Sequence, residues 1–191
     1  MPSPHPGHRG PGSQLMGVSA VSARSAWAVG GYSGRNPSGT CCRSYQLILH
    51  WNGKTWRQVK PGGDRNVKAL YDVAAVGRNN AWAAGISRTS KGSSFPLFKH
   101  WNGHLWRTVA GPPDPAMSSQ TLTDLAPLAR NDIWAGGWSV DNSGETTQAL
   151  AEHWDGKAWS TSPSPSPGAH ALFLGIAATT PRAVWAVGYY S

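Results

Sequence analysis

Cysteine is nearly absent from this 191-residue chain, which has two, adjacent at Cys41 and Cys42. Such a pair excludes a small fold stapled by several disulfides and a zinc site built from several cysteines. A disulfide between neighbours is strained, so free thiols or a bridge to another segment are favoured. Long apolar runs are also absent: residues 171–178 form the longest, with eight residues. A membrane-spanning helix needs about 18, so none is predicted.

Acidic residues are scarce as well: the chain has 9 Asp and Glu residues and 17 Lys and Arg residues, which gives a net charge of +8. A basic excess suits nucleic acid, anionic lipid or acidic glycans. The basic residues are scattered singly, which favours an ordinary basic surface, and a nucleic-acid partner is not expected. The first 14 residues are polar, with no apolar segment, so no signal peptide is predicted. Residues 1–13, rich in Pro and Gly, are expected to be disordered.

An internal repeat dominates what is present. Four apolar segments end in the motif Trp-Ala-(Val/Ala/Gly)-Gly. The motif begins at Trp27, Trp82, Trp134 and Trp185, and the spacings between these tryptophans are 55, 52 and 51 residues. An apolar residue precedes each of these tryptophans by nine positions: Val18, Val73, Leu125 and Ile176. The motif His-Trp-(Asn/Asp)-Gly-x-x-Trp follows at residues 50–56, 100–106 and 153–159. Constant pieces joined by segments of variable length are typical of strands joined by loops.

Each repeat is predicted to contain four short strands, A to D. Strand A is the first apolar run, strand B carries the Trp-Ala-x-Gly motif, and strands C and D flank the Asn-Gly or Asp-Gly pair. These dipeptides favour a two-residue hairpin turn. In the first repeat this turn would pair Trp51 with Lys54 and Leu49 with Trp56.

Four-stranded units with a period near 50 predict an all-β protein made of β-propeller blades. The sequence holds three complete blades, about 14–61, 68–112 and 120–163, and the first two strands of a fourth in 170–191. Because closed propellers need about four to eight blades, the chain is expected to be part of a longer repeat protein. The alternative is that it self-associates through its open blade edges.

The repeat resembles bacterial propeller proteins of the kelch and galactose-oxidase-like superfamily. In kelch blades a Gly-Gly pair ends the second strand and an aromatic residue follows; Gly30-Gly31-Tyr32 and Gly136-Gly137-Trp138 match this pattern, whereas Gly85-Ile86 and Gly188-Tyr189 keep one glycine. The resemblance implies an extracellular or cell-surface location. The copper ligands of galactose oxidase match no position here, so no cofactor is expected. Propellers host many activities, so the resemblance does not assign one.

Ligand binding is expected on the face formed by the variable loops, which are rich in Ser, Gly, Pro, Asn and Thr. The loops between strands B and C are 31–44, 87–94 and 139–147, and those between D and the next A are 60–68, 110–120 and 162–169. Such loops suit a glycan or a protein partner, although they are also typical of tolerant surface loops. The candidate ligand-binding residues are Tyr32, Trp138, Tyr189 and Asn142.

The opposite face would carry one arginine in each turn between strands A and B: Arg24, Arg78, Arg130 and Arg182. These arginines are either solvated turn residues, which is favoured, or a partial ring for an anionic partner.

Asp72 and Asp124 share one position of strand A, which lines the central channel of a propeller. Two carboxylates there are the weak catalytic candidates, as an acid/base pair of a glycan hydrolase or lyase. The repeated His50, His100 and His153 lie in different blades, too far apart to share one ion, so packing is favoured and no metal site is predicted. The favoured function is therefore a non-enzymatic binding module.

Overall fold

The computed structural model describes residues 12–34, 43–63, 67–88, 93–112, 114 and 117–191, and all regular elements in these ranges are β-strands. The first repeat contains β1 (Gly12–Ser22), β2 (Ser25–Gly34), β3 (Arg43–Trp51) and β4 (Trp56–Gln58); the second contains β5 (Val67–Gly77), β6 (Asn80–Arg88), β7 (Ser94–Trp101) and β8 (Trp106–Val109); the third contains β9 (Met117–Ala129), β10 (Asp132–Asp141), β11 (Thr147–Trp154) and β12 (Trp159–Ser162); the last contains β13 (Ala171–Thr180) and β14 (Ala183–Tyr190).

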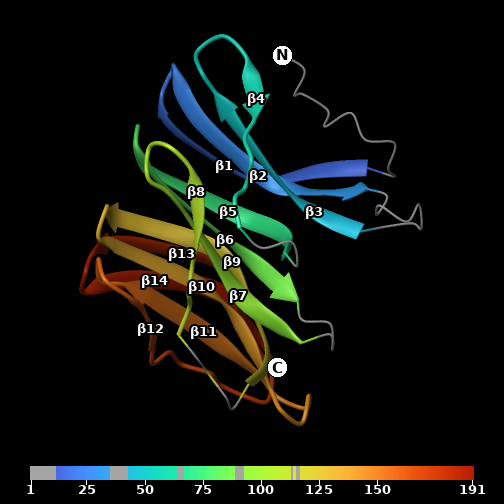
Figure 1. Cartoon of the computed structure of the whole chain (residues 1–191). Coiled ribbons are helices and arrows are strands. Elements are labelled where there is room, and N and C mark those ends of the chain that lie inside the picture. The colour runs from blue at the N-terminus through green and yellow to red at the C-terminus, as the bar shows by residue number, and fades with distance from the viewer. Residues whose placement is uncertain (1–11, 35–42, 64–66, 89–92, 113, 115–116) are drawn as a thin grey trace.

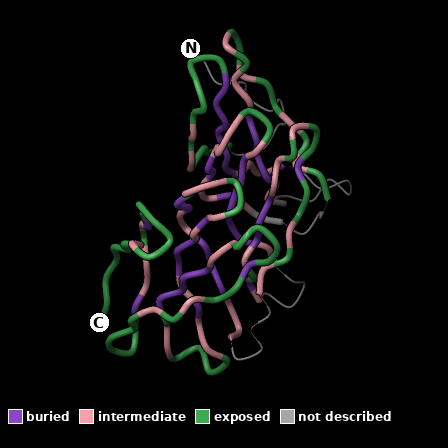
Figure 2. The backbone as a smooth tube through the Cα atoms, turned by 90° about the vertical axis from the view of Figure 1, so that its left-hand side faces the viewer, coloured by how far each residue is buried: buried purple, intermediate pink, exposed green. Residues whose placement is uncertain are grey.

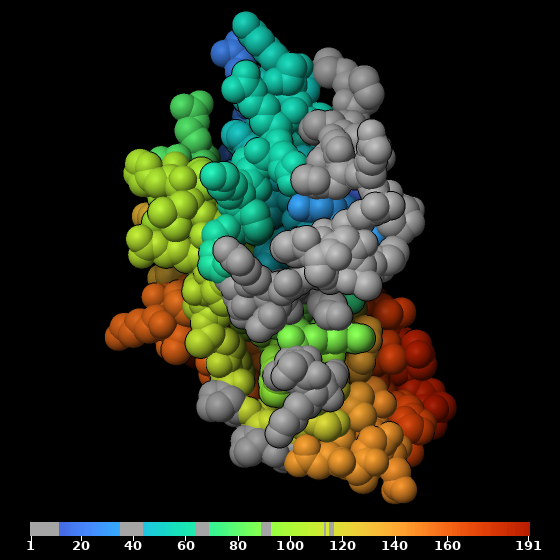
Figure 3. All heavy atoms as spheres, turned by 45° about the vertical axis from the view of Figure 1, so that its right-hand side comes forward, coloured from blue at the N-terminus to red at the C-terminus, as the bar shows by residue number. Residues whose placement is uncertain are grey.

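The strands form three antiparallel four-stranded blades in chain order, followed by a two-stranded half-blade, β13–β14. The blades follow one another down the molecule (Figures 1 and 3). A single parallel pair, Ser94 with Ser119, joins β7 to β9, and Thr147 pairs in the same way with His170. Each pair links strand C of one blade to the start of the next blade. The predicted all-β propeller architecture is confirmed. β1 starts at Gly12, and residues 1–11 of the predicted disordered segment lie outside the described residues.

The predicted hairpin register is wrong by two residues. In the first blade Trp51 pairs with Trp56 and Leu49 with Gln58, so the loop has four residues rather than two. The Asn52 Oδ1 atom accepts hydrogen bonds from the backbone N–H groups of Lys54 and Thr55, at 3.0 and 2.9 Å. Asn102 and Asp155 do the same in the other blades. This side-chain capping satisfies backbone N–H groups of the wider loop, in which the glycine has a positive φ.

Tryptophans build the interface between consecutive blades. We call the side of each blade that carries the strand-B tryptophan its leading face, and the other side its trailing face. Trp27 on the leading face of blade 1 packs on Trp101 and Trp106 of blade 2, with ring centroids 5.0 and 5.1 Å apart. Trp82 packs in the same way on Trp154 and Trp159 of blade 3, at 4.8 and 5.5 Å. Buried aliphatic residues complete each interface.

One glycine per repeat is required by a close approach of the backbone. It lies three residues after the strand-B tryptophan, at Gly30, Gly85, Gly137 and Gly188. A methyl group added at any of them would lie within 2.2 Å of a carbonyl oxygen of strand A. No side chain fits there, so this glycine fixes how strands A and B lie against each other.

Candidate functional site

A cleft lies at the loop end of the first blade, where β1 begins, β2 ends and β3 begins. Its volume is about 530 Å³, and its polar lining includes Ser13, Gln14, Ser33 and Ser44. Tyr32 and Ala69, the latter from blade 2, complete the walls together with Gly12, Met16 and Gly31. Hydroxyl, amide and backbone groups beside an aromatic ring are the chemistry that binds polar, hydroxyl-rich ligands. Because the cleft lies where β2 ends and β3 begins, it is on the side of the blade that carries the variable loop between strands B and C.

Tyr32 belongs to the end of β2 and stacks on Tyr45 of β3, with ring centroids 5.2 Å apart and planes 20° apart. Burial, followed by the electrostatic influence of Tyr45, raises the pKa of the Tyr32 hydroxyl. The hydroxyl therefore stays protonated at neutral pH and keeps a hydrogen for donation.

Trp138 and Tyr189 do not occupy the same repeat position as Tyr32. Counted from the strand-B tryptophan, Trp138 and Tyr189 are the fourth residue, and Tyr32 is the fifth. The shared glycine at the third position fixes this register, and strand alternation then places Tyr32 on the opposite blade face. Trp138 is half-buried within β10, whereas Tyr189 is 58% exposed on β14. The structure brings neither of them into the loop-end cleft.

Asn142 is exposed in the turn after β10, and its neighbour Asp141 organises that turn. The Asp141 carboxylate accepts hydrogen bonds from the Thr146 hydroxyl at 2.6 Å and from the Ser143 hydroxyl and Gly144 N–H, each at 2.8 Å. These bonds, that of Thr146 first, lower the pKa of Asp141 to about 2. Sequence reasoning missed Asp141, although Asp followed by Ser and Gly is a known turn signal.

Asp72 and Asp124 tie neighbouring blades together. The Asp72 Oδ2 atom accepts the backbone N–H of Leu125 at 3.0 Å, and the Asp124 Oδ2 atom accepts that of Ile176 at 2.7 Å. Asp124 Oδ1 also accepts the Leu125 N–H at 3.0 Å, so the two carboxyl groups share one donor. A β-bulge precedes each aspartate, between residues 70 and 72 and between residues 122 and 124. Such a bulge re-aims the side chains beside it.

Burial, and to a lesser degree the hydrogen bond and charge of Asp124, raises the pKa of Asp72 to about 7. The two carboxyl groups therefore lie beside each other at the Leu125 N–H, and Asp72 binds a proton more readily than an ordinary aspartate. Both carboxyl groups are also engaged by backbone N–H donors of the following repeat.

Replacing Asp124 with alanine should lower the free energy of unfolding by about 1–3 kcal/mol, because two backbone N–H groups lose an acceptor. Urea unfolding followed by far-UV circular dichroism measures the change. Asp124→Asn keeps a carbonyl acceptor and should lose less, and Glu145→Ala, an exposed loop acid, serves as the control. An Asp124→Ala variant as stable as the control would contradict the linking role.

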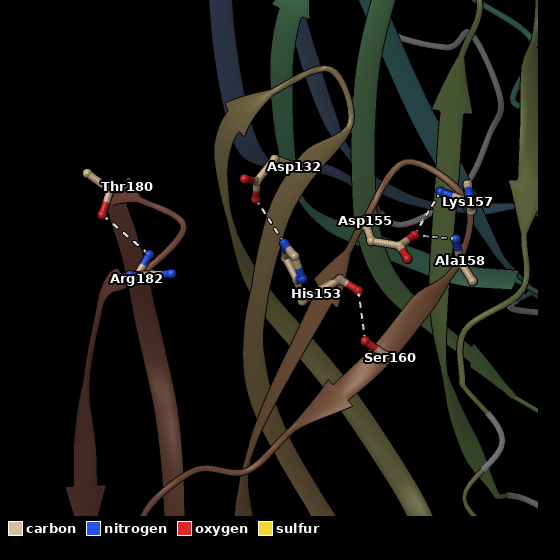
Figure 4. A network of polar contacts seen from close by, with 8 residues as sticks. All are labelled: Asp132, His153, Asp155, Lys157, Ala158, Ser160, Thr180 and Arg182. Atoms are coloured by element: carbon tan, nitrogen blue, oxygen red, sulfur yellow. Dashed lines mark hydrogen bonds and ion pairs between the residues drawn. The ribbon is translucent and has the colours of Figure 1, made fainter.

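The three repeated histidines each pack against the strand-B tryptophan of their own blade. The ring centroids of His50 and Trp27, His100 and Trp82, and His153 and Trp134 lie 4.3, 4.5 and 4.4 Å apart. His153 Nε2 also contacts Asp132 Oδ1 at 2.8 Å (Figure 4). Within the described ranges, no group of three or more His, Cys, Asp or Glu could hold a metal ion.

All four turn arginines are exposed, but they occupy two repeat positions. Arg24 and Arg182 are the third residue before the strand-B tryptophan, whereas Arg78 and Arg130 are the fourth. Arg182 lies in the β13–β14 turn, where its N–H donates to the Thr180 hydroxyl at 3.3 Å (Figure 4). The predicted ring is therefore not built from equivalent residues.

Sequence reasoning also missed a buried charged position on the trailing faces, the residue before each repeated histidine. Lys99 is fully buried there, and its ammonium donates to the Gly62 carbonyl at 2.6 Å and to the Thr108 hydroxyl at 2.9 Å. Glu152 has the same position one blade later and is also fully buried, and neither of its carboxyl oxygens has a hydrogen-bond partner among the described residues. Burial, and secondarily the charge of Asp114, raises the pKa of Glu152 to about 8.

Several predicted features lie outside the described residues: Cys41 and Cys42, and the central parts of the loops 31–44, 60–68, 87–94 and 110–120. In the part of the chain that is described, no helix is long and apolar enough to cross a membrane.

Comparison with protein-family models and with curated proteins found no match. Among solved structures, one described as "YCF48 bound to D1 peptide" is similar at 11% sequence identity, over 91% of this chain and 90% of that chain, with a TM-score of 0.23. A score of this size supports no shared site or ligand, so the fold assignment rests on the blades themselves.

Proposed function

We propose that the chain is a non-enzymatic binding module of the kelch-like propeller type, which takes a glycan or a protein partner at its loop-end cleft. The observation that carries the proposal is the cleft itself, with its polar lining of Ser13, Gln14, Ser33 and Ser44 beside Tyr32. Sugar hydroxyls hydrogen-bond to such groups, and the C–H face of a sugar ring stacks on an aromatic ring, so the chemistry favours a glycan.

The test is a glycan array probed with the purified chain, followed by calorimetric titration of any glycan that binds. Gln14→Ala and Tyr32→Ala remove an exposed amide and the aromatic wall, and each should weaken binding at least about tenfold. Arg78→Ala changes an exposed turn on the opposite face and should bind like the wild type. Equal affinity of all three variants would contradict this location, and binding of a protein in place of any glycan would redirect the proposal to that partner.

The second candidate is part of a propeller enzyme that acts on glycans through Asp72 and Asp124. The observation in its favour is the raised pKa of Asp72, about 7, a value suited to acid/base chemistry. Hydrolysis or lyase products released by the wild type and lost in Asp72→Asn would support it. Unchanged glycan binding by Asp72→Asn, with no product from either protein, favours the binding module.

A further inference from the structure

Basic side chains gather at the end of the blades that lies opposite the loop-end cleft, where the A–B turns and the C–D hairpins are. Figure 2 views the molecule from the side on which the A–B turns lie in Figure 1. The four turn arginines described above are at this end, and all are exposed. Four more exposed basic residues join them: Lys54 and Lys157 in the hairpin loops, and Arg57 and Arg107 directly after the hairpins. We call these eight residues the basic end.

The acidic side chains near the basic end are already engaged. Asp132 contacts a histidine of its own blade at 2.8 Å (Figure 4). Asp155 Oδ1 accepts two backbone N–H groups of its hairpin, at 2.8 and 2.9 Å, and its charge also acts on Lys157. The other two hairpins have the neutral Asn52 and Asn102 at this position. None of the eight basic side chains forms an ion pair with a carboxylate in the described part of the chain, so the basic end keeps a large net positive charge.

Packing of the turns does not require this charge. The third residue before the strand-B tryptophan covers the glycine of the neighbouring hairpin. A methyl group added at Gly53 would lie 3.2 Å from Arg24, and one added at Gly103 would lie 3.0 Å from Asn79, so asparagine fills this position as well as arginine. In blade 2 the arginine comes one residue earlier, at Arg78, and blade 3 has the same arrangement. Every A–B turn thus has an arginine although its position differs, and the shared feature is the charge rather than one contact.

The other residues of these turns limit the kind of anionic partner. The hairpin tryptophans, whose rings could stack on bases, are engaged within the protein. Trp101 packs on Trp27 of the preceding blade, with ring centroids 5.0 Å apart, and Trp51 Nε1 donates to the Ala23 carbonyl at 3.0 Å. These rings therefore form no stacking platform for single-stranded nucleic acid. Apart from Leu105, the turns and hairpin loops consist of polar residues, glycine, alanine and proline, so they supply no apolar segment for insertion into lipid.

From these features we infer that the basic end docks on an anionic lipid bilayer without inserting into it. The eight side chains are spread over the four A–B turns and the three hairpins of consecutive blades. A planar layer of lipid phosphates contacts many such separate points at once, whereas a linear polyanion follows a single row of them. Guanidinium groups form paired hydrogen bonds with phosphate oxygens, and each basic residue near an anionic membrane surface adds to the attraction. Docking in this way leaves the loop-end cleft facing away from the membrane.

The test is co-sedimentation of the purified chain with lipid vesicles. Vesicles of phosphatidylcholine with about 30% phosphatidylglycerol should bind the chain, and vesicles of phosphatidylcholine alone should not. Because the attraction acts between exposed charges, raising the NaCl concentration from about 0.1 M to about 0.5 M should release the chain. Equal binding to the neutral vesicles, binding that survives the salt, or no binding to the anionic vesicles would overturn the inference.

Two double variants remove the same charge from opposite ends of the blades. Arg78→Gln with Arg107→Gln should weaken binding to the anionic vesicles at least about tenfold. Lys60→Gln with Arg88→Gln changes two exposed side chains at the loop end and should weaken binding less than about threefold. All four side chains are exposed, so both variants should keep the melting temperature of the wild type. An equal loss of binding in the two variants would overturn the docking surface, because net charge alone would then explain the binding.

Two soluble polyanions distinguish a bilayer from other anionic partners. A short DNA duplex and poly-glutamate are each titrated into the chain bound to anionic vesicles, at matched concentrations of negative charge. Weak competition by both polymers supports the bilayer. Displacement of the chain by either polymer at a lower charge concentration than that of the vesicles would overturn the inference, because that polymer would then be the better partner.

Discussion

Replacing Trp82 with alanine should lower the free energy of unfolding by about 3–5 kcal/mol, a large part of the total stability expected of a domain this size. Trp82 is 1% exposed, and it contacts His100 of its own blade and two tryptophans of the next. Its removal opens a cavity at the interface that holds blades 2 and 3 together. Urea unfolding followed by far-UV circular dichroism measures the loss without depending on tryptophan fluorescence.

The repeat supplies a matched control for this variant. Trp185→Ala makes the same chemical change at the same repeat position, but the side chain is 68% exposed. Its effect should stay within about 0.5 kcal/mol. If both variants lost the same free energy, burial between blades would not be the source of the stability. If unfolding of Trp82→Ala separated into two transitions, the interface would be the weak point at which the blades uncouple.

The sequence predicted the elements that depend on local pattern. The four strand-B motifs and the Asn-Gly and Asp-Gly hairpins lie where the periodicity placed them, because alternation and turn residues act over a few neighbours. The hairpin loop length was wrong because the side chains of Asn52, Asn102 and Asp155 cap a four-residue loop as effectively as a tight turn closes a two-residue one. Dipeptide identity alone does not distinguish the two loops.

The candidate sites depended on contacts between blades, which the pattern of one repeat does not contain. The Gly-Gly-aromatic pattern placed Tyr32 and Trp138 at the same repeat position, and this alignment was wrong. Two adjacent glycines, Gly30 and Gly31, left the alignment ambiguous until the close approach of Gly30 to strand A fixed it. The role of Asp72 depends on the backbone of Leu125, 53 residues further along the chain. The cleft lining and the burial of Lys99 and Glu152 likewise depend on how strands and loops distant in sequence come together.

Glu152 should destabilise the fold at neutral and alkaline pH. The pKa of its carboxyl group is about 8 in the folded chain, against an ordinary value of 4.5. Between these values the folded state binds a proton that the unfolded state has lost, so stability falls as the pH rises. The penalty is absent below about pH 4.5 and is complete above about pH 8. At about 1.4 kcal/mol per pH unit, it is on the order of 3 kcal/mol at pH 7.

Glu152→Leu places at this position the residue that the first blade already has there, Leu49. The variant should be more stable than the wild type at pH 8 by a few kcal/mol, because a buried carboxyl with no hydrogen-bond partner in the described part of the chain is replaced by an apolar side chain. Glu145→Leu, which changes an exposed loop acid, should leave stability nearly unchanged. Urea midpoints measured at intervals from pH 5 to pH 9 give both comparisons.

The window between pH 7 and pH 8 isolates the contribution of Glu152. Asp72, with a pKa of about 7, lowers stability with rising pH mainly below that value. His50 and His100 have lowered pKa values because of burial, so they act in the opposite direction below their ordinary value of 6.5. The wild type should therefore still lose stability from pH 7 to pH 8, and Glu152→Leu should not. If the stability of Glu152→Leu still fell from pH 7 to pH 8, another group would be taking up this proton. The Glu152 carboxylate would then be stabilised despite its burial.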